Sequence, residues 1–194
     1  MPEQDAVVVV TSGLKDMQAV LNLIWDKLLP AMKGESLPAN SEDQNKLKNK
    51  LAGLTVPTLQ GSATSGLLEQ IGGKQYVFPT NDQKIEWMGL EMSKADRQTT
   101  LVVKSNGGTE QKIACGNGVW HKGRIAYGAF SEQTVAACGA WMADDKYVVK
   151  LCFYETPFIL TLNLTLSGNK LALETKRNVG FGPLSPKQLV GESK

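Results

Sequence analysis

The most informative stretch of the sequence is Phe158-Ile-Leu-Thr-Leu-Asn-Leu-Thr-Leu166, which continues through Ser167-Gly-Asn-Lys170 into Leu171-Ala-Leu-Glu-Thr-Lys-Arg177. Large apolar residues occupy every second position of the first part, which is the pattern of a β-strand with one buried face. Gly168-Asn169 fits a two-residue hairpin loop that would place Leu166 opposite Leu171 and Leu164 opposite Leu173. This register puts the apolar side chains of both strands on one face, so the stretch predicts an antiparallel hairpin.

Beyond Gly61, short strand patterns alternate with turn-forming residues to the end of the chain. The predicted strands cover residues 76–78, 85–93, 99–104, 111–115, 124–127, 135–142, 147–154, 158–166 and 171–179. The turns between them include Asn81-Asp82, Ala95-Asp96 and Asp144-Asp145. Because no gap is long enough for a helix, we expect consecutive strands to pair antiparallel and the meander to close, which removes its exposed edges. The expected fold is mainly β, an antiparallel lipocalin-like barrel of about eight strands.

The first 60 residues have a different pattern. Ala6-Val-Val-Val-Val-Thr11 is typical of a short strand buried on both faces, and from Asp16, a plausible helix cap, apolar residues recur at helical spacing until Pro30. Ser41-Glu-Asp-Gln44 matches a capping box that would start a second helix ending near Gly53. We therefore expect a strand and amphipathic helix in residues 1–33, a linker with one short helix in 34–60, and the barrel in 61–194.

Composition excludes several classes of protein. Apolar residues make up 42% of the chain and charged residues 21%, with a net charge of +2, so we expect a soluble globular protein with no nucleic-acid or membrane partner. The three cysteines, Cys115, Cys138 and Cys152, lack metal-ligand spacing and are interpreted as small buried residues. We expect no metal and no cofactor, and the cysteines leave the compartment undefined.

Several short stretches resemble one family. Asp5-Ala-Val-Val-Val-Val-Thr-Ser-Gly13 and Met17-Gln-Ala-Val-Leu-Asn-Leu-Ile-Trp-Asp-Lys-Leu-Leu29 resemble the last strand and helix of serine β-lactamases and penicillin-binding-protein-like hydrolases. Gly61-Ser-Ala-Thr-Ser65, Tyr154-Glu-Thr-Pro-Phe158 and Asn178-Val-Gly-Phe-Gly-Pro183 are similar to the β-rich extension of some bacterial members. The resemblance implies a non-catalytic C-terminal accessory domain whose partner is the catalytic domain of a bacterial, periplasmic or secreted parent hydrolase.

The catalytic motifs of that family have look-alikes in this chain. Ser12-Gly-Leu-Lys15 has the spacing of its Ser-x-x-Lys element, and His121-Lys-Gly123 that of its third element. These motifs must converge from a sheet and an all-helical subdomain, for which the chain has no room. Ser12, Lys15 and His121 are therefore kept only as the site of an alternative, independently active serine hydrolase, and His121 is otherwise expected in a surface turn.

Two further alternatives concern binding. A barrel of this size could hold a small apolar ligand, and its lining would include Trp87, Trp120, Trp141, Met88 and Met92, although packing in a solid core is the default explanation for these residues. Residues 6–29 would lack their native neighbours in an isolated fragment, so they could also form a homodimer.

Overall fold

The predicted hairpin is present in the computed structural model, which describes residues 1–35, 38–93, 98–128, 131–180 and 184–194. Strands β8 (Ile159–Ser167) and β9 (Lys170–Arg177) pair antiparallel, with Leu166 opposite Leu171 and Leu164 opposite Leu173 as predicted. Gly168 has a φ of 61° at the first position of the two-residue loop, a conformation that favours glycine. The alternating leucines of β8 are all buried.

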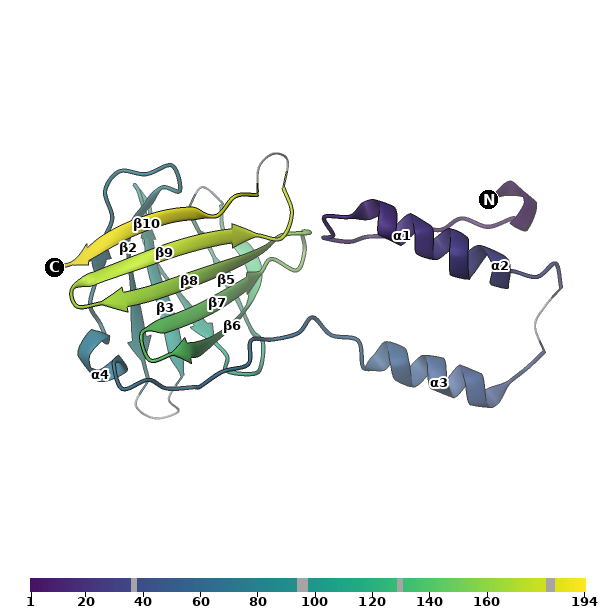
Figure 1. Ribbon diagram of the computed structural model, residues 1–194, viewed down its shortest axis with the longest axis horizontal. Helices are drawn as coiled ribbons and strands as arrows, with labels where there is room; N and C mark the ends of the chain where they lie inside the picture. Colours follow the sequence, from purple (N-terminus) through teal and green to yellow (C-terminus); the bar gives the residue numbers. More distant parts are fainter. Residues whose placement is uncertain (36–37, 94–97, 129–130, 181–183) are drawn as a thin grey trace. The chain divides into compact units, whose positions relative to one another are not determined.

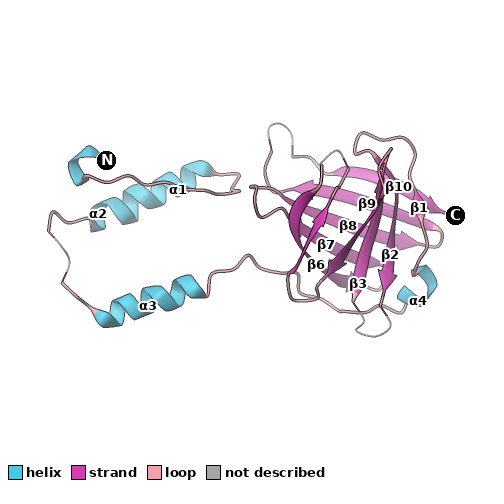
Figure 2. Cartoon of the chain, turned by 180° about the vertical axis from the view of Figure 1, so that it is seen from behind, coloured by secondary structure: helices cyan, strands magenta, loops and turns pink. Residues whose placement is uncertain are grey.

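Ten antiparallel strands form one sheet (Figures 1 and 2). The other strands are β1 (Tyr76–Val77), β2 (Ile85–Met92), β3 (Thr99–Ser105), β4 (Glu110–Cys115), β5 (His121–Ile125), β6 (Gln133–Ala143), β7 (Lys146–Cys152) and β10 (Lys187–Ser193). Consecutive strands pair from β1 to β4 and from β5 to β10, and β10 also pairs with β1, so the sheet runs from β4 at one edge to β5 at the other. The expectation of a mainly β, antiparallel barrel is confirmed, with ten strands rather than about eight.

No pattern in the sequence predicted strand β10. Leu189 and Val190 are its only large apolar residues, and they are adjacent, so no alternating pattern arises. The strand is held instead by pairing with β9 on one side and β1 on the other. Its Gly191 lies where an added Cβ would be 3.0 Å from the ring of Phe78.

The barrel is nearly closed, with β4 and β5 as the two edges of the sheet. Gly123 of β5 has no side chain, and an added Cβ there would lie 2.6 Å from the Cδ1 of Ile113 in β4, so the isoleucine fills the space between the edges. Strand β6 extends past the first residue of β5, His121, which pairs with Ala137. Beyond that point Cys138 of β6 pairs with Gly116, and Trp141 of β6 pairs with Ser62. Three separate segments therefore cover the one long edge of β6.

The strand directions define two ends of the barrel. At one end, here called the Arg177 end, β5 and β9 finish and β8 and β10 begin. At the other, the His121 end, β4 finishes and β5 begins. Between them the interior is packed with apolar side chains such as Ile85, Leu101 and Leu162. Helix α4 (Leu68–Ile71), which the sequence did not predict, adds Leu68 and Ile71 to this core.

Residues Met1–Pro57 and Thr58–Lys194 form two separate compact units. In the first, η1 (Pro2–Gln4) precedes a helix made of α1 (Met17–Leu23), a π-helical turn η2 (Ile24–Leu28) and α2 (Leu29–Ala31). Asp16 caps it as predicted, since its side chain accepts a hydrogen bond from the Ala19 N–H at 3.1 Å.

Two expectations for this unit were wrong. Residues 6–11 form no strand, and Val7 is 87% exposed, because the unit offers no sheet with which they could pair. Helix α3 (Ser41–Ala52) is capped by Asn40, whose side-chain oxygen accepts from the Glu42 and Asp43 N–H groups. Ser41 is thus the first helical residue, and the predicted capping box does not form. The predicted turn at Ala95-Asp96 lies outside the described residues.

Candidate ligand-binding site

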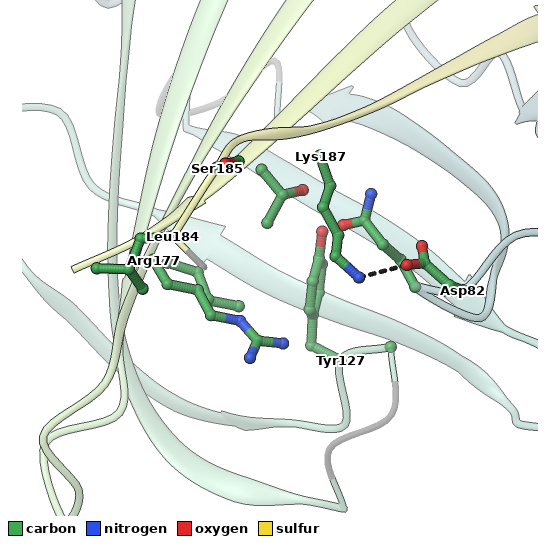
Figure 3. Close-up of a pocket in the computed structure, with 10 residues that line it drawn as sticks. Asp82, Tyr127, Arg177, Leu184, Ser185 and Lys187 are labelled. Atoms are coloured by element: carbon green, nitrogen blue, oxygen red, sulfur yellow. Dashed lines mark hydrogen bonds and ion pairs between the residues drawn. The ribbon is translucent and has the colours of Figure 1, made fainter. Parts of the chain in front are cut away.

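A pocket of about 100 Å³ opens at the Arg177 end of the barrel (Figure 3). Residues from the loop before β2, the segment after β5, strands β8 and β9 and the start of β10 surround it. They are Asp82, Gln83, Tyr127, Gly128, Leu160, Thr175, Arg177, Leu184, Ser185 and Lys187.

The strand pattern places two of these residues on the inner face of β9. Leu171, Leu173, Thr175 and Arg177 occupy alternate positions, so they share one face of the strand. The two leucines are buried in the core, and the face then becomes polar towards the end of the strand. Thr175 is buried, whereas Arg177 is exposed at the rim.

Gln83 is positioned by a loop that Asn81 holds in place. The Asn81 side-chain amide donates to the carbonyls of Pro79 and Ile85, each at 2.8 Å, and its oxygen accepts from the Ile85 N–H at 3.2 Å. One side chain therefore fixes both ends of the turn that carries Asp82 and Gln83.

Tyr127 is positioned by the glycine that follows it. Gly128 has a φ of 61°, and an added Cβ would lie 2.7 Å from the Gln83 carbonyl oxygen. Its N–H donates to the Ser105 Oγ at 3.0 Å. Only glycine adopts this conformation and approach without strain, so Gly128 brings the Tyr127 segment against the Gln83 loop.

Three buried polar atoms that line the pocket lack a hydrogen-bond partner within the described part of the chain. They are Gln83 Nε2, Tyr127 Oη and Thr175 Oγ1. Burial raises the pKa of Tyr127 far above its usual value, an effect that the nearby Thr175 hydroxyl partly offsets. The two hydroxyls nevertheless lack hydrogen-bond geometry, so both keep unused bonding capacity.

The rim of the pocket carries charge of both signs. Lys187 forms an ion pair with Asp82, and this hydrogen bond lowers the pKa of the Asp82 carboxyl group. In the view of Figure 3, Tyr127 is drawn between this pair and Arg177. Two cations, Arg177 and Lys187, and one anion, Asp82, give the rim a net charge of +1.

A second pocket, of about 350 Å³, lies at the His121 end. Its residues are Ala63, Gln98, Thr99, Cys115, Gly116, Asn117, His121, Gly139 and Tyr147. The expectation that His121 lies in a surface turn was wrong, because it is the first residue of β5 and is half-buried. The Gln98 side-chain nitrogen lies 2.8 Å from its Nε2.

The residues of the alternative hydrolase site belong to different units. Ser12 and Lys15 lie in the N-terminal unit, in a non-helical segment before α1, and Lys15 is exposed. His121 lies in the barrel unit.

The Cys115 thiol in the lining of the His121 pocket is a poor nucleophile. Burial raises its pKa to about 12, so it is neutral at physiological pH.

The aromatic and methionine residues expected to line a ligand cavity line neither of the two pockets described above. Met88 and Trp141 are buried in the core, and Met92 packs against it. The Trp141 ring lies 5.0 Å from that of Tyr147, and Trp120 is half-buried. Trp87 is buried and lines a smaller pocket, of about 30 Å³.

Sequence reasoning missed Gln83, Tyr127 and Thr175. Thr175 and Arg177 gave a usable signal, since they continue the inward face of Leu171 and Leu173 with polar side chains. Gln83 and Tyr127 had no such signal, because Gln83 lies in a loop and Tyr127 lies after β5. No periodic pattern in such segments indicates which way a side chain points.

Comparisons with known proteins identify no relative: no protein-family model, curated protein or solved structure matches the chain. Within the described residues there is no group of three or more His, Cys, Asp or Glu side chains placed to hold a metal ion. No helix among those residues is both long and apolar enough to cross a membrane.

Proposed function

We propose that the barrel binds a small organic anion, a short-chain carboxylate, in the pocket at the Arg177 end. The observation that carries this proposal is the convergence of three buried, unpartnered polar atoms on one pocket. Leaving a buried polar group unsatisfied costs about 1–3 kcal/mol, so three around one space favour an occupant that bonds to them.

The chemistry of the three groups suits a carboxylate. The Gln83 amide nitrogen and the hydroxyls of Tyr127 and Thr175 all donate hydrogen bonds, and carboxylate oxygens accept several at once. The net positive rim attracts an anion, and a guanidinium such as that of Arg177 binds carboxylates through paired hydrogen bonds. A neutral ligand would use the donors but not the charge.

The apolar surface and size of the pocket limit the rest of the ligand. Leu160 and Leu184 supply its apolar wall. Leu160 is itself part of the packed core, which closes the barrel below the pocket. A short alkyl chain fits about 100 Å³, whereas a long one would have to displace core side chains.

Calorimetric titration with butyrate and its neutral amide, butyramide, tests the proposal. We expect butyrate to bind more tightly, and Thr175→Val, Tyr127→Phe and Arg177→Gln each to weaken it by about fivefold or more, the equivalent of one lost hydrogen bond.

Three matched controls lie outside the pocket. Thr134→Val and Tyr76→Phe remove other buried hydroxyls that lack a partner, and Arg124→Gln removes an exposed guanidinium paired with Glu132. These variants should bind butyrate normally. Absence of butyrate binding would mean that water alone fills the pocket, and equal affinity for butyramide would show that charge is not recognised; either result overturns the proposal.

Exposed apolar side chains in the N-terminal unit favour a second function, association with another protein. Val7, Val9, Leu23 and Trp25 are each more than half exposed. Such surfaces often mark protein interfaces, which supports the predicted partner, a β-lactamase-like catalytic domain, or a second copy bound through residues 6–29. Sedimentation of the full chain tests the second copy: a dimer that Trp25→Glu dissociates supports it, and a monomer at all concentrations removes it.

A further inference from the structure

The pocket at the His121 end has a different chemistry from the one at the Arg177 end. Its polar side chains are those of Gln98, Thr99, Asn117, His121 and Tyr147, and the described residues that line it include no carboxylate, ammonium or guanidinium group. The described linings of the two pockets therefore differ in charge, and the pockets differ in volume.

The strand register directs these side chains into the barrel. Thr99 pairs with Cys115 and His121 with Ala137, and residues directly opposite one another share a face of the sheet. Cys115 and Ala137 belong to the core, so Thr99 and His121 also face inward. The pocket is thus an enlargement of the interior at one end of the barrel.

Two glycines make room for the polar side chains. An added Cβ at Gly139 would lie 2.2 Å from the Tyr147 Oη and 3.0 Å from the Cys115 Cβ. At Gly116 it would lie 2.6 Å from the His121 Cδ2. Small residues at these positions therefore admit the Tyr147 hydroxyl and the His121 ring.

We infer that the His121 end is a second binding site, independent of the carboxylate pocket, for a small uncharged molecule with both a hydrogen-bond donor and an acceptor, such as a primary amide. Transferring a charged group from water into a site without a counter-charge is costly, so this lining disfavours ions. The Asn117 amide and the hydroxyls of Thr99 and Tyr147 can each donate and accept, which matches the two sides of an amide ligand.

The single histidine makes a direct test practical. Benzamide and benzoate have the same aromatic ring and differ in charge, and the ring resonances of His121, the only histidine, report on this pocket in NMR spectra. We expect benzamide to shift these resonances saturably and benzoate to leave them unchanged at the same concentration. Thr99→Val and Asn117→Ala should each weaken benzamide binding by about fivefold.

The controls separate this proposal from the carboxylate site. Thr175→Val lies in the other pocket and should leave benzamide affinity unchanged, as should Tyr76→Phe, which lies in neither. Because Asn117 is exposed, its variant should fold even if Thr99→Val does not. Absence of a saturable shift, equal response to benzoate, or normal affinity in the Asn117 variant would overturn the inference, whatever the result with butyrate.

Discussion

Thr175→Val should make the ligand-free protein more stable and reduce its stabilisation by butyrate. The Thr175 hydroxyl is buried without a partner, and valine has nearly the same shape and favours strands. Relief of the unsatisfied hydroxyl should raise the free energy of unfolding by about 1 kcal/mol. For a chain of this size, that corresponds to a rise of about 2–4 °C in the midpoint of thermal unfolding.

Butyrate should cancel this difference in stability. A ligand present at a hundredfold excess over its dissociation constant stabilises the folded state by about 2.7 kcal/mol. At the same concentration a variant with fivefold weaker affinity gains about 1.8 kcal/mol, which is about 1 kcal/mol less than the wild-type protein gains. Thermal unfolding should therefore show Thr175→Val more stable than wild type without butyrate and nearly equal to it with butyrate, while Thr134→Val, which removes a hydroxyl outside the pocket, should keep the same stability difference in both conditions. A variant less stable than wild type without ligand would refute the reasoning, because it would show that the Thr175 hydroxyl is already satisfied.

Four further predictions test other properties of the barrel. Asp82→Asn should tighten butyrate binding, most clearly at low salt, because it raises the net rim charge from +1 to +2; unchanged affinity in titrations would exclude a role for this charge. The Asp82–Lys187 pair lowers the pKa of the Asp82 carboxyl group in the folded state. The contribution of this pair to stability is therefore present at neutral pH and lost as pH falls through the lowered pKa. Asp82→Asn should lack this loss of stability when its acid unfolding is compared with that of the wild-type protein. Gly139→Ala should destabilise the protein by about 1–3 kcal/mol in urea unfolding, since its Cβ would meet the Tyr147 hydroxyl, while Gly66→Ala, with open space around it and, like Gly139, no positive φ, serves as the control. Cys115 and Cys138 should react with a thiol reagent at pH 8 only after unfolding, because burial raises the pKa of both thiols; rapid labelling of the folded protein, located by mass spectrometry, would contradict their placement.

The sequence predicts the fold correctly wherever burial of one face of a strand requires an apolar residue at every second position. The register of the β8–β9 hairpin was predicted correctly, because alternating leucines leave one register that buries the apolar side chains of both strands on the same face. Strand β10 escaped prediction because backbone pairing with β9 and β1, rather than an apolar face, holds it in the sheet. The strand predicted for residues 6–11 was wrong for the opposite reason. Their composition favours a strand, but a strand also requires a neighbouring strand to pair with, which composition does not guarantee.

The candidate sites were harder to predict because they depend on which strand ends meet. His121 and Cys115 are near one another in sequence, but Tyr147 and Gly139 join them only through the closure of the barrel. The same is true of Gln83, Tyr127 and Thr175, which come from three separate segments. No local pattern contains that information.

The departures from apolar alternation nevertheless follow a rule that connects sequence to function. On β8 the inward face is leucine from Leu160 to Leu166, and no described pocket penetrates the middle of that strand. On β9 the inward face changes from leucine to Thr175 and Arg177, and on β3 the inward Leu101 gives way to Thr99 at the strand start. The buried Thr99 and Thr175 sacrifice hydrophobic burial at positions where the fold alone would favour another leucine, whereas Arg177 is exposed at the rim. Because these replacements gather at the two barrel ends and leave the middle apolar, the stability lost there is most simply explained by binding at the ends.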